Sequence, residues 1–236
     1  MNVFLTGQPK AGNHISWGIP KILGKELFNI WYGEEFNKKP NDWFLNKTDL
    51  FFIKNHLSYS IDIEKRLRYL GSKMILIIRD LRDLIASVYR ATAVRLHPKS
   101  LLDISRFESL TQEQFINWCI LAKHWPHAPE YFKKYFLPWM NVDFCYTTRF
   151  EILIGSKGGG NDQLQKEEFQ RICEFIDLPQ TDEWYEENTP KLYNLEADTF
   201  IPGGKIGVWK KYFNQKNIET FEIAAGELNR KLGYEK

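Results

Sequence analysis

A short loop near the start of the chain carries a lysine between two glycines. The apolar run 3–5 leads into the stretch TGQPKAGNH, where glycines five positions apart enclose Lys10. Backbone N–H groups of a loop that opens a helix point at an anion, so the pattern suits a phosphate. The glycine spacing matches a Walker A loop, but Asn13 and His14 stand where that motif has lysine and a hydroxyl residue. Taken alone, the pattern fits a plain strand-to-helix turn equally well.

Two basic side chains follow a second apolar run. In LFFIKNHLSYS, Lys54 and His56 are two positions apart, so an extended chain places both on one face. An imidazole is suited to take a proton from a hydroxyl or amine. A neighbouring lysine can stabilise negative charge on a leaving phosphate oxygen and keep the imidazole neutral. A surface lysine beside a hydrogen-bonded histidine would leave the same pattern.

A third apolar run ends in an arginine. The stretch MILIIRDLRDLIASVY places Arg79 at a predicted strand end and Ser87 on the helix that follows. A guanidinium and a hydroxyl in these positions can share one phosphate group. The two Arg-Asp pairs of the stretch also fit simple salt bridges at the start of a helix.

Four short apolar runs and three helical patterns supply the framework for these residues. Most of the runs are apolar on both faces, as expected for parallel strands covered by helices on each side. We predict a doubly wound parallel sheet in three α/β/α layers, P-loop NTPase-like, in a single domain 1–236. Ligands of such folds bind beyond the carboxyl ends of the strands, where all three constellations fall. The predicted strands are 3–6, 50–53, 74–78 and 142–146, and the helical patterns follow Thr111 and its capping partner Gln114, follow Gln165, and cover 218–232 up to Gly233.

Composition narrows the class of protein. The 236 residues are 43% hydrophobic, with a net charge of +2, which gives no indication of nucleic-acid binding. Three widely spaced cysteines form no disulfide framework or zinc pattern, and His124 and His127 resemble a metal pair only by count. No apolar run reaches the roughly 18 residues of a membrane span, and the chain opens on a strand rather than a signal segment. We expect a soluble cytoplasmic protein that binds no metal, membrane or nucleic acid.

Aromatic residues gather in segments 25–49 and 118–139. They could wall a pocket for an acceptor molecule, or they could belong to the hydrophobic core.

The order and spacing of the motifs resemble the sulfotransferases that use 3′-phosphoadenosine 5′-phosphosulfate (PAPS). The family's Pro-Lys-Ser-Gly-Thr loop looks like residues 9–13, its Lys-Thr-His-Leu motif like 54–57, and its Arg-Asp-Pro-Arg-Asp motif with a later serine like 79–87. RFEILIGSKGGGNDQLQ at 149–165 is similar to the family's Tyr-Glu-Asp-Leu segment, and GGKIGVWKKYF at 203–213 to its C-terminal Arg-Lys-Gly-x-x-Gly-x-Trp-Lys block.

The resemblance implies a role for each matching residue. His56 would be the base, with Lys10 and Lys54 neutralising the charge that develops. The reaction would be in-line sulfuryl transfer to a hydroxyl or amine of a small-molecule acceptor, without a metal, leaving 3′-phosphoadenosine 5′-phosphate (PAP). The residues expected to bind PAPS are Lys10, Ala11, Gly12, Asn13 and His14 for the phosphosulfate, and Arg79, Ser87, Gly203, Gly204 and Lys205 for the 3′-phosphate.

The chain departs from the family pattern at several positions. Asn13 and His14 replace two threonines, and Ile15 replaces a tryptophan that would stack on adenine. Pro202-Gly203 replaces an Arg-Lys pair, and one lost charge-assisted hydrogen bond costs about 1.5–3 kcal/mol. Two alternatives therefore stand beside the active enzyme: a catalytically impaired nucleotide-binding relative, and a P-loop kinase that uses ATP and Mg²⁺.

Overall fold

A five-stranded parallel sheet forms the centre of the protein. The computed structural model describes residues 1–30, 33–93, 107, 109–193 and 204–235. The strand order is β2-β3-β1-β4-β5, and every neighbouring pair is parallel. The strands are β1 (Asn2–Gly7), β2 (Glu26–Asn29), β3 (Phe51–Lys54), β4 (Lys73–Ile78) and β5 (Cys145–Arg149).

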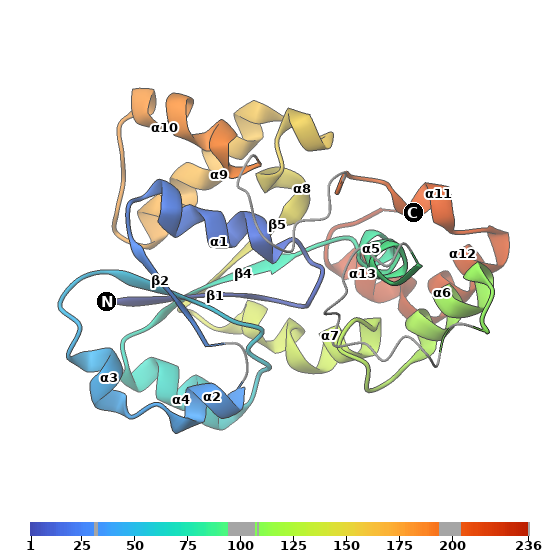
Figure 1. Ribbon diagram of the computed structural model, residues 1–236, viewed down its shortest axis with the longest axis horizontal. Helices are drawn as coiled ribbons and strands as arrows, with labels where there is room; N and C mark the ends of the chain where they lie inside the picture. Colours follow the sequence, from blue (N-terminus) through green and yellow to red (C-terminus); the bar gives the residue numbers. More distant parts are fainter. Residues whose placement is uncertain (31–32, 94–106, 108, 194–203, 236) are drawn as a thin grey trace.

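Helices cover both faces of this sheet, as predicted for an α/β fold. Figure 1 shows α1, α8, α9 and α10 on one face, α2, α3, α4 and α7 on the other, and α5, α6 and α11 to α13 beyond the carboxyl ends of the strands. The helices are α1 (Asn13–Ile22), α2 (Gly33–Lys38), α3 (Asn41–Leu45), α4 (Ile61–Tyr69), α5 (Leu81–Ala93), α6 (Gln112–Leu121), α7 (Pro129–Tyr135), α8 (Phe150–Leu153), α9 (Asp162–Phe175), α10 (Asp182–Asn188), α11 (Trp209–Tyr212), α12 (Gln215–Phe221) and α13 (Glu227–Lys231). Short 3₁₀ helices cover Leu137–Asn141, Ser156–Gly158 and Thr189–Leu192, and a π-helical turn covers Glu222–Gly226.

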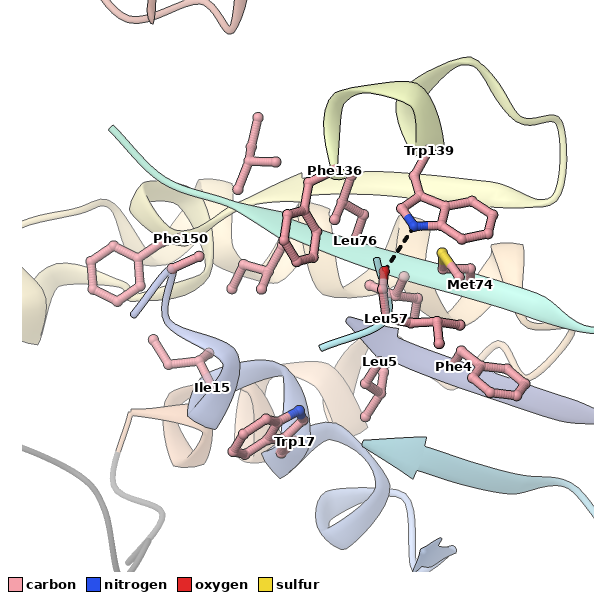
Figure 2. Packing of buried hydrophobic residues seen from close by; sticks show 14 of the residues in the cluster. Phe4, Leu5, Ile15, Trp17, Leu57, Met74, Leu76, Phe136, Trp139 and Phe150 are labelled. Atoms are coloured by element: carbon pink, nitrogen blue, oxygen red, sulfur yellow. Dashed lines mark hydrogen bonds between the residues drawn. The ribbon is translucent and has the colours of Figure 1, made fainter. Parts of the chain in front are cut away.

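The central strands are buried on both faces, which accounts for their continuous apolar runs. Phe4 is fully buried and packs against Phe36 and Phe44. Trp139 packs against the segment that follows β3, and its indole N–H donates to the carbonyl of Leu57 at 2.9 Å (Figure 2). Part of the aromatic segment 25–49 is thus core rather than pocket wall.

Three predicted strands are confirmed to within one residue, but the fourth is displaced. Strand β5 begins at Cys145 rather than Val142, because Val142 belongs to the end of a 3₁₀ turn and its carbonyl accepts the N–H of Cys145. Strand β2 is absent from the prediction. It is a four-residue edge strand with exposed ends, so it lacks the buried run that marks a central strand.

The predicted helix signals are largely confirmed. Thr111 and Gln114 form a complete capping box at the start of α6. The predicted terminal helix is interrupted by the π-helical turn, and it stops at Gly233, whose φ is +83°. Among the described residues, no helix has both the length and the apolar character needed to cross a membrane.

Candidate active site

The loop after β1 is pinned between neighbouring elements by its two glycines. A Cβ on Gly7 would lie 2.6 Å from the carbonyl oxygen of Ile77 in the adjacent strand β4. Gly12 precedes α1 with a φ of +98°, and a Cβ there would lie 2.2 Å from the ring of Phe150. Both positions therefore require glycine, one for close packing and the other also for its left-handed backbone.

Hydrogen bonds inside the loop fix its shape. The N–H of Ala11 and the side-chain amide of Asn13 both donate to the carbonyl of Gln8, at 3.0 and 2.9 Å. The side-chain amide of Asn13 thus stabilises the loop. The backbone N–H of Asn13 lies in the first turn of α1, where N–H groups have no intrahelical acceptor. Lys10 has a φ of +73°, an uncommon conformation for a residue with a side chain, and burial lowers the pKa of its ammonium group.

His56 is held by the end of strand β1. Its Nδ1 lies 2.7 Å from the carbonyl oxygen of Gly7. A carbonyl can only accept a hydrogen bond, so Nδ1 carries the proton, and in the neutral ring Nε2 then keeps its lone pair. Burial lowers the pKa of His56, the bond to Gly7 opposes that shift, and the positive charge of Lys10 adds to it. The imidazole is therefore a neutral base near pH 7.

Trp17 of α1 brings the two basic residues of the second motif together. The Lys54 ammonium lies 5.1 Å from the centre of the Trp17 ring, and the His56 ring lies 5.7 Å from it. The His14 ring packs against the same indole at 4.8 Å. Sequence reasoning did not assign Trp17 to this side of the loop. Its position one helical turn after His14, on a helix that opens toward the site, was the available signal.

Arg79 lies beside the same loop, immediately after β4. Its guanidinium stacks on the Phe150 ring at 4.1 Å and donates to the carbonyls of Lys10 and Lys205, at 3.4 and 3.2 Å. Arg79 is 5% exposed, and its Nε is buried without a hydrogen-bond partner. Burial lowers its pKa, and neighbouring carboxylates, Asp83 first among them, oppose that shift. Buried polar groups normally have partners, so the orphaned Nε is suited to an anionic ligand.

The C-terminal motif reaches this site through Asp83. The carboxylate of Asp83 accepts the N–H groups of Gly207 and Trp209, at 2.7 and 2.8 Å. The N–H of Ile206 donates to the carbonyl of Gly158 in the glycine-rich loop, at 3.2 Å. These contacts bring the segment that starts at Gly204 next to Arg79. From the sequence, Asp83 was a candidate only for a salt bridge at the start of the helix, and its contacts with Gly207 and Trp209 were not predicted. The ion pair in this stretch joins Arg82 to Asp80 at 2.7 Å.

The other residues predicted for the 3′-phosphate have fewer contacts that tie them to Arg79 and the loop. Ser87 is half-buried in the second turn of α5, on the helix that follows Arg79. Lys205 contributes its carbonyl to Arg79, and its side chain is exposed. Gly203 lies outside the described residues. Within the described part of the chain, no cluster of three or more His, Cys, Asp and Glu side chains could hold a metal ion.

The cations and the loop together fit phosphate-like anionic groups. Lys10, Lys54 and Arg79 come from three different strand ends around one helix-opening loop, and the unpartnered Nε of Arg79 offers a buried donor. Cations and loop N–H groups arranged in this way can bind two anionic groups, while His56 offers a lone pair for a proton.

Comparisons with solved structures identify the fold that carries these residues. No family model and no curated protein matches the chain. Mouse sulfotransferase SULT7A1, solved with PAP, superposes with a TM-score of 0.65 at 15% identity, covering 98% of this chain and 88% of that one. The chain has the sulfotransferase fold. Retinol dehydratase shares this sulfotransferase fold in two structures that both hold PAP, one with androsterone (TM-score 0.60) and one with retinol (0.57). Each is 17% identical and covers 96% of this chain and 80% of that one.

Proposed function

We propose that the chain is a PAPS-dependent sulfotransferase that acts on a hydroxyl or amine of a small molecule. The observation that carries the proposal is the pairing of His56 with the loop. A neutral histidine is hydrogen-bonded to Gly7, the residue that begins the loop, and its Nε2 keeps the lone pair. The shared fold supports this assignment, since the similar structures hold PAP.

The residues around the loop fit the two anionic ends of the nucleotide. Lys10 and the N–H groups of residues 12–14 would bind the 5′-phosphosulfate, because a helix N-terminus and an ammonium group both favour negative charge. Arg79 would bind the 3′-phosphate through its unpartnered Nε, together with Ser87 and the backbone of residues 203–205. In this assignment the N–H of Ala11 serves the loop itself, since it already donates to Gln8.

The chemistry of this chain's residues follows from their protonation states. PAPS, when bound to the protein, would supply the sulfuryl group. His56 takes the acceptor's proton on Nε2 as the new bond forms, and its Nδ1–H stays on the Gly7 carbonyl. Lys10 and Lys54 stabilise the negative charge on the phosphate oxygen that leaves. Retinol dehydratase was solved with retinol and androsterone, which supports a small hydroxyl-bearing acceptor here.

Nucleotide binding tests the proposal before any acceptor is known. Thermal unfolding is measured with PAP, AMP and ATP-Mg²⁺, each over a concentration series. At a hundredfold excess over Kd, a bound nucleotide adds about 2.7 kcal/mol, which is roughly 5–10 °C in Tm for a chain of this length. The proposal expects a shift with PAP that AMP does not match. A shift with ATP-Mg²⁺ alone would instead indicate a kinase, and no shift would refute the nucleotide site.

Transfer is then measured with PAPS and a panel that contains androsterone, retinol, 2-naphthol and a primary amine. PAP binding without sulfation of any member would favour a catalytically impaired relative.

A further inference from the structure

A second histidine is clamped against the loop by a residue of the loop itself. Gln8 is fully buried and follows β1 directly. Its side-chain nitrogen donates to the carbonyls of Pro126 and Ala128, at 3.0 and 2.9 Å, so the residue between them, His127, is fixed beside the loop. The backbone turn is closed by the N–H of Ala128 donating to the carbonyl of Trp125 at 2.9 Å.

The imidazole of His127 takes no part in that clamp. His127 is 8% exposed, yet its Nδ1 is buried without a hydrogen-bond partner. A histidine kept for structural reasons normally uses its ring nitrogens on neighbouring carbonyls or hydroxyls. Here Gln8 binds the two flanking carbonyls instead. The ring therefore offers a polar atom that the fold does not use.

The electrostatics of His127 connect it to the candidate active site. Burial lowers its pKa to about 3, and the positive charges of Lys10 and His56 contribute to that shift. At ordinary ionic strength a charge shifts the pKa of another group appreciably only when the two lie close together. The imidazole is neutral at pH 7, so it can accept or donate a hydrogen bond without adding charge next to Lys10.

A series of aromatic rings leads from His127 to the protein surface. The His127 ring packs on Trp125 at 4.6 Å, and Trp125 packs on Trp118 at 4.7 Å. Trp118 is 37% exposed and also packs on Phe107 at 4.7 Å. This series of rings ends at the imidazole of His127, next to the residues that Gln8 binds.

We propose that His127 is an acceptor-binding residue, whose imidazole hydrogen-bonds the acceptor at the oxygen or nitrogen that His56 deprotonates, with Trp125 packed against the acceptor's body. The proposal rests on the proposed sulfotransferase function. It assigns the two histidines different tasks: His56 takes the proton, and His127 holds the reacting atom in place. His56 already uses its Nδ1 on the carbonyl of Gly7, whereas the Nδ1 of His127 is buried without a hydrogen-bond partner.

Three variants separate this role from a structural one. His127→Phe keeps a ring against Trp125 and leaves the Gln8 clamp intact, because the clamp uses backbone carbonyls. His127→Asn keeps hydrogen-bonding capacity. His124→Phe is the matched control, since His124 lies three residues earlier on the same segment and is exposed.

The test measures PAP binding by calorimetry and steady-state transfer from PAPS to the best acceptor of the panel named above. For His127→Phe we expect the acceptor KM to rise about tenfold, as for the loss of one hydrogen bond in a buried site, with the PAP Kd unchanged within about twofold. His127→Asn should recover part of that loss, and His124→Phe should match the wild type.

Two results would overturn the inference, and they differ from a failure of the proposed function. Unchanged acceptor kinetics in His127→Phe would show that the imidazole does not contact the acceptor. If PAP binding weakened by the same factor as the acceptor KM rose, His127 would instead support the structure of the loop. Failure of the proposed function would appear in the wild type itself, as an absence of PAP binding and of transfer, and the role of His127 would fall with it.

Discussion

Acid should destabilise the fold through His127, and replacing this residue should remove the effect. In the unfolded chain its imidazole takes up a proton near pH 6.5, whereas burial lowers the pKa in the folded protein to about 3. Between these two values the unfolded state binds more protons than the native state. The contribution of His127 to stability is therefore complete above pH 6.5 and is lost as the pH falls through this window.

The size of the effect follows from the shift. One pKa unit corresponds to about 1.4 kcal/mol, so lowering the pH from 7 to 5 should remove about 2 kcal/mol of unfolding free energy through His127 alone. That figure requires the folded pKa of His127 to lie well below 5, as the value of about 3 does. Since a domain is typically stable by about 5–15 kcal/mol, the loss is readily measured.

Urea unfolding of the wild type and of His127→Phe at the two pH values isolates this contribution. We expect the wild type to lose about 2 kcal/mol more than the variant between pH 7 and pH 5. The lowered pKa of His56 acts in the same direction, and because His56 is present in both proteins, most of its effect cancels in the comparison. The exposed His124 provides a control variant that should behave as the wild type. Equal losses in the wild type and His127→Phe would refute the reasoning, because they would mean that the folded protein protonates His127 as easily as the unfolded chain does.

Three further predictions concern the loop and the two ends of the nucleotide. His56→Asn should lower kcat for transfer by about 10²–10⁴-fold and leave the PAP Kd within about twofold, and a matching loss of PAP affinity would argue against the role of base. Arg79→Lys keeps the charge but loses the planar fork, so calorimetry should show PAP binding weakened by about tenfold or more and AMP binding nearly unchanged; equal weakening of both would contradict a 3′-phosphate site. Gly12→Ala should lower the free energy of unfolding by at least about 1–3 kcal/mol, because the φ of +98° is strained for alanine and the added Cβ would overlap Phe150, and an unchanged Tm would contradict this packing.

Local patterns predicted most of the sheet correctly, and the exceptions have physical reasons. Strands β1, β3 and β4 are buried on both faces, so their apolar runs mark them in any context. Edge strand β2 lacks that signal. The start of β5 was predicted too early because Val142 looks like a strand residue in the sequence. In the structure it is buried (8% exposed) at the end of a 3₁₀ turn rather than in a strand.

For the candidate site, too, some residues could be predicted from the sequence and others could not. The sequence alone indicated Lys10, His56 and Arg79, because each follows an apolar run and parallel strands bring their carboxyl ends to one edge. The sequence also raised His127, but only as half of an unconvincing metal pair. Its relation to the loop depends on Gln8 contacts that span 118 and 120 positions, and no local pattern encodes them.

The sequence by itself determined the chemical groups and the strand-loop-helix units that carry them, because those depend on neighbours within a few positions. Tertiary structure decided which proton His56 keeps, through the carbonyl of Gly7, 49 positions away. It also decided that Asp83 would hold the backbone at Gly207, 124 positions later. Such contacts form only when the sheet and its helices pack, since packing brings distant segments within hydrogen-bonding distance and removes the water that would otherwise satisfy them.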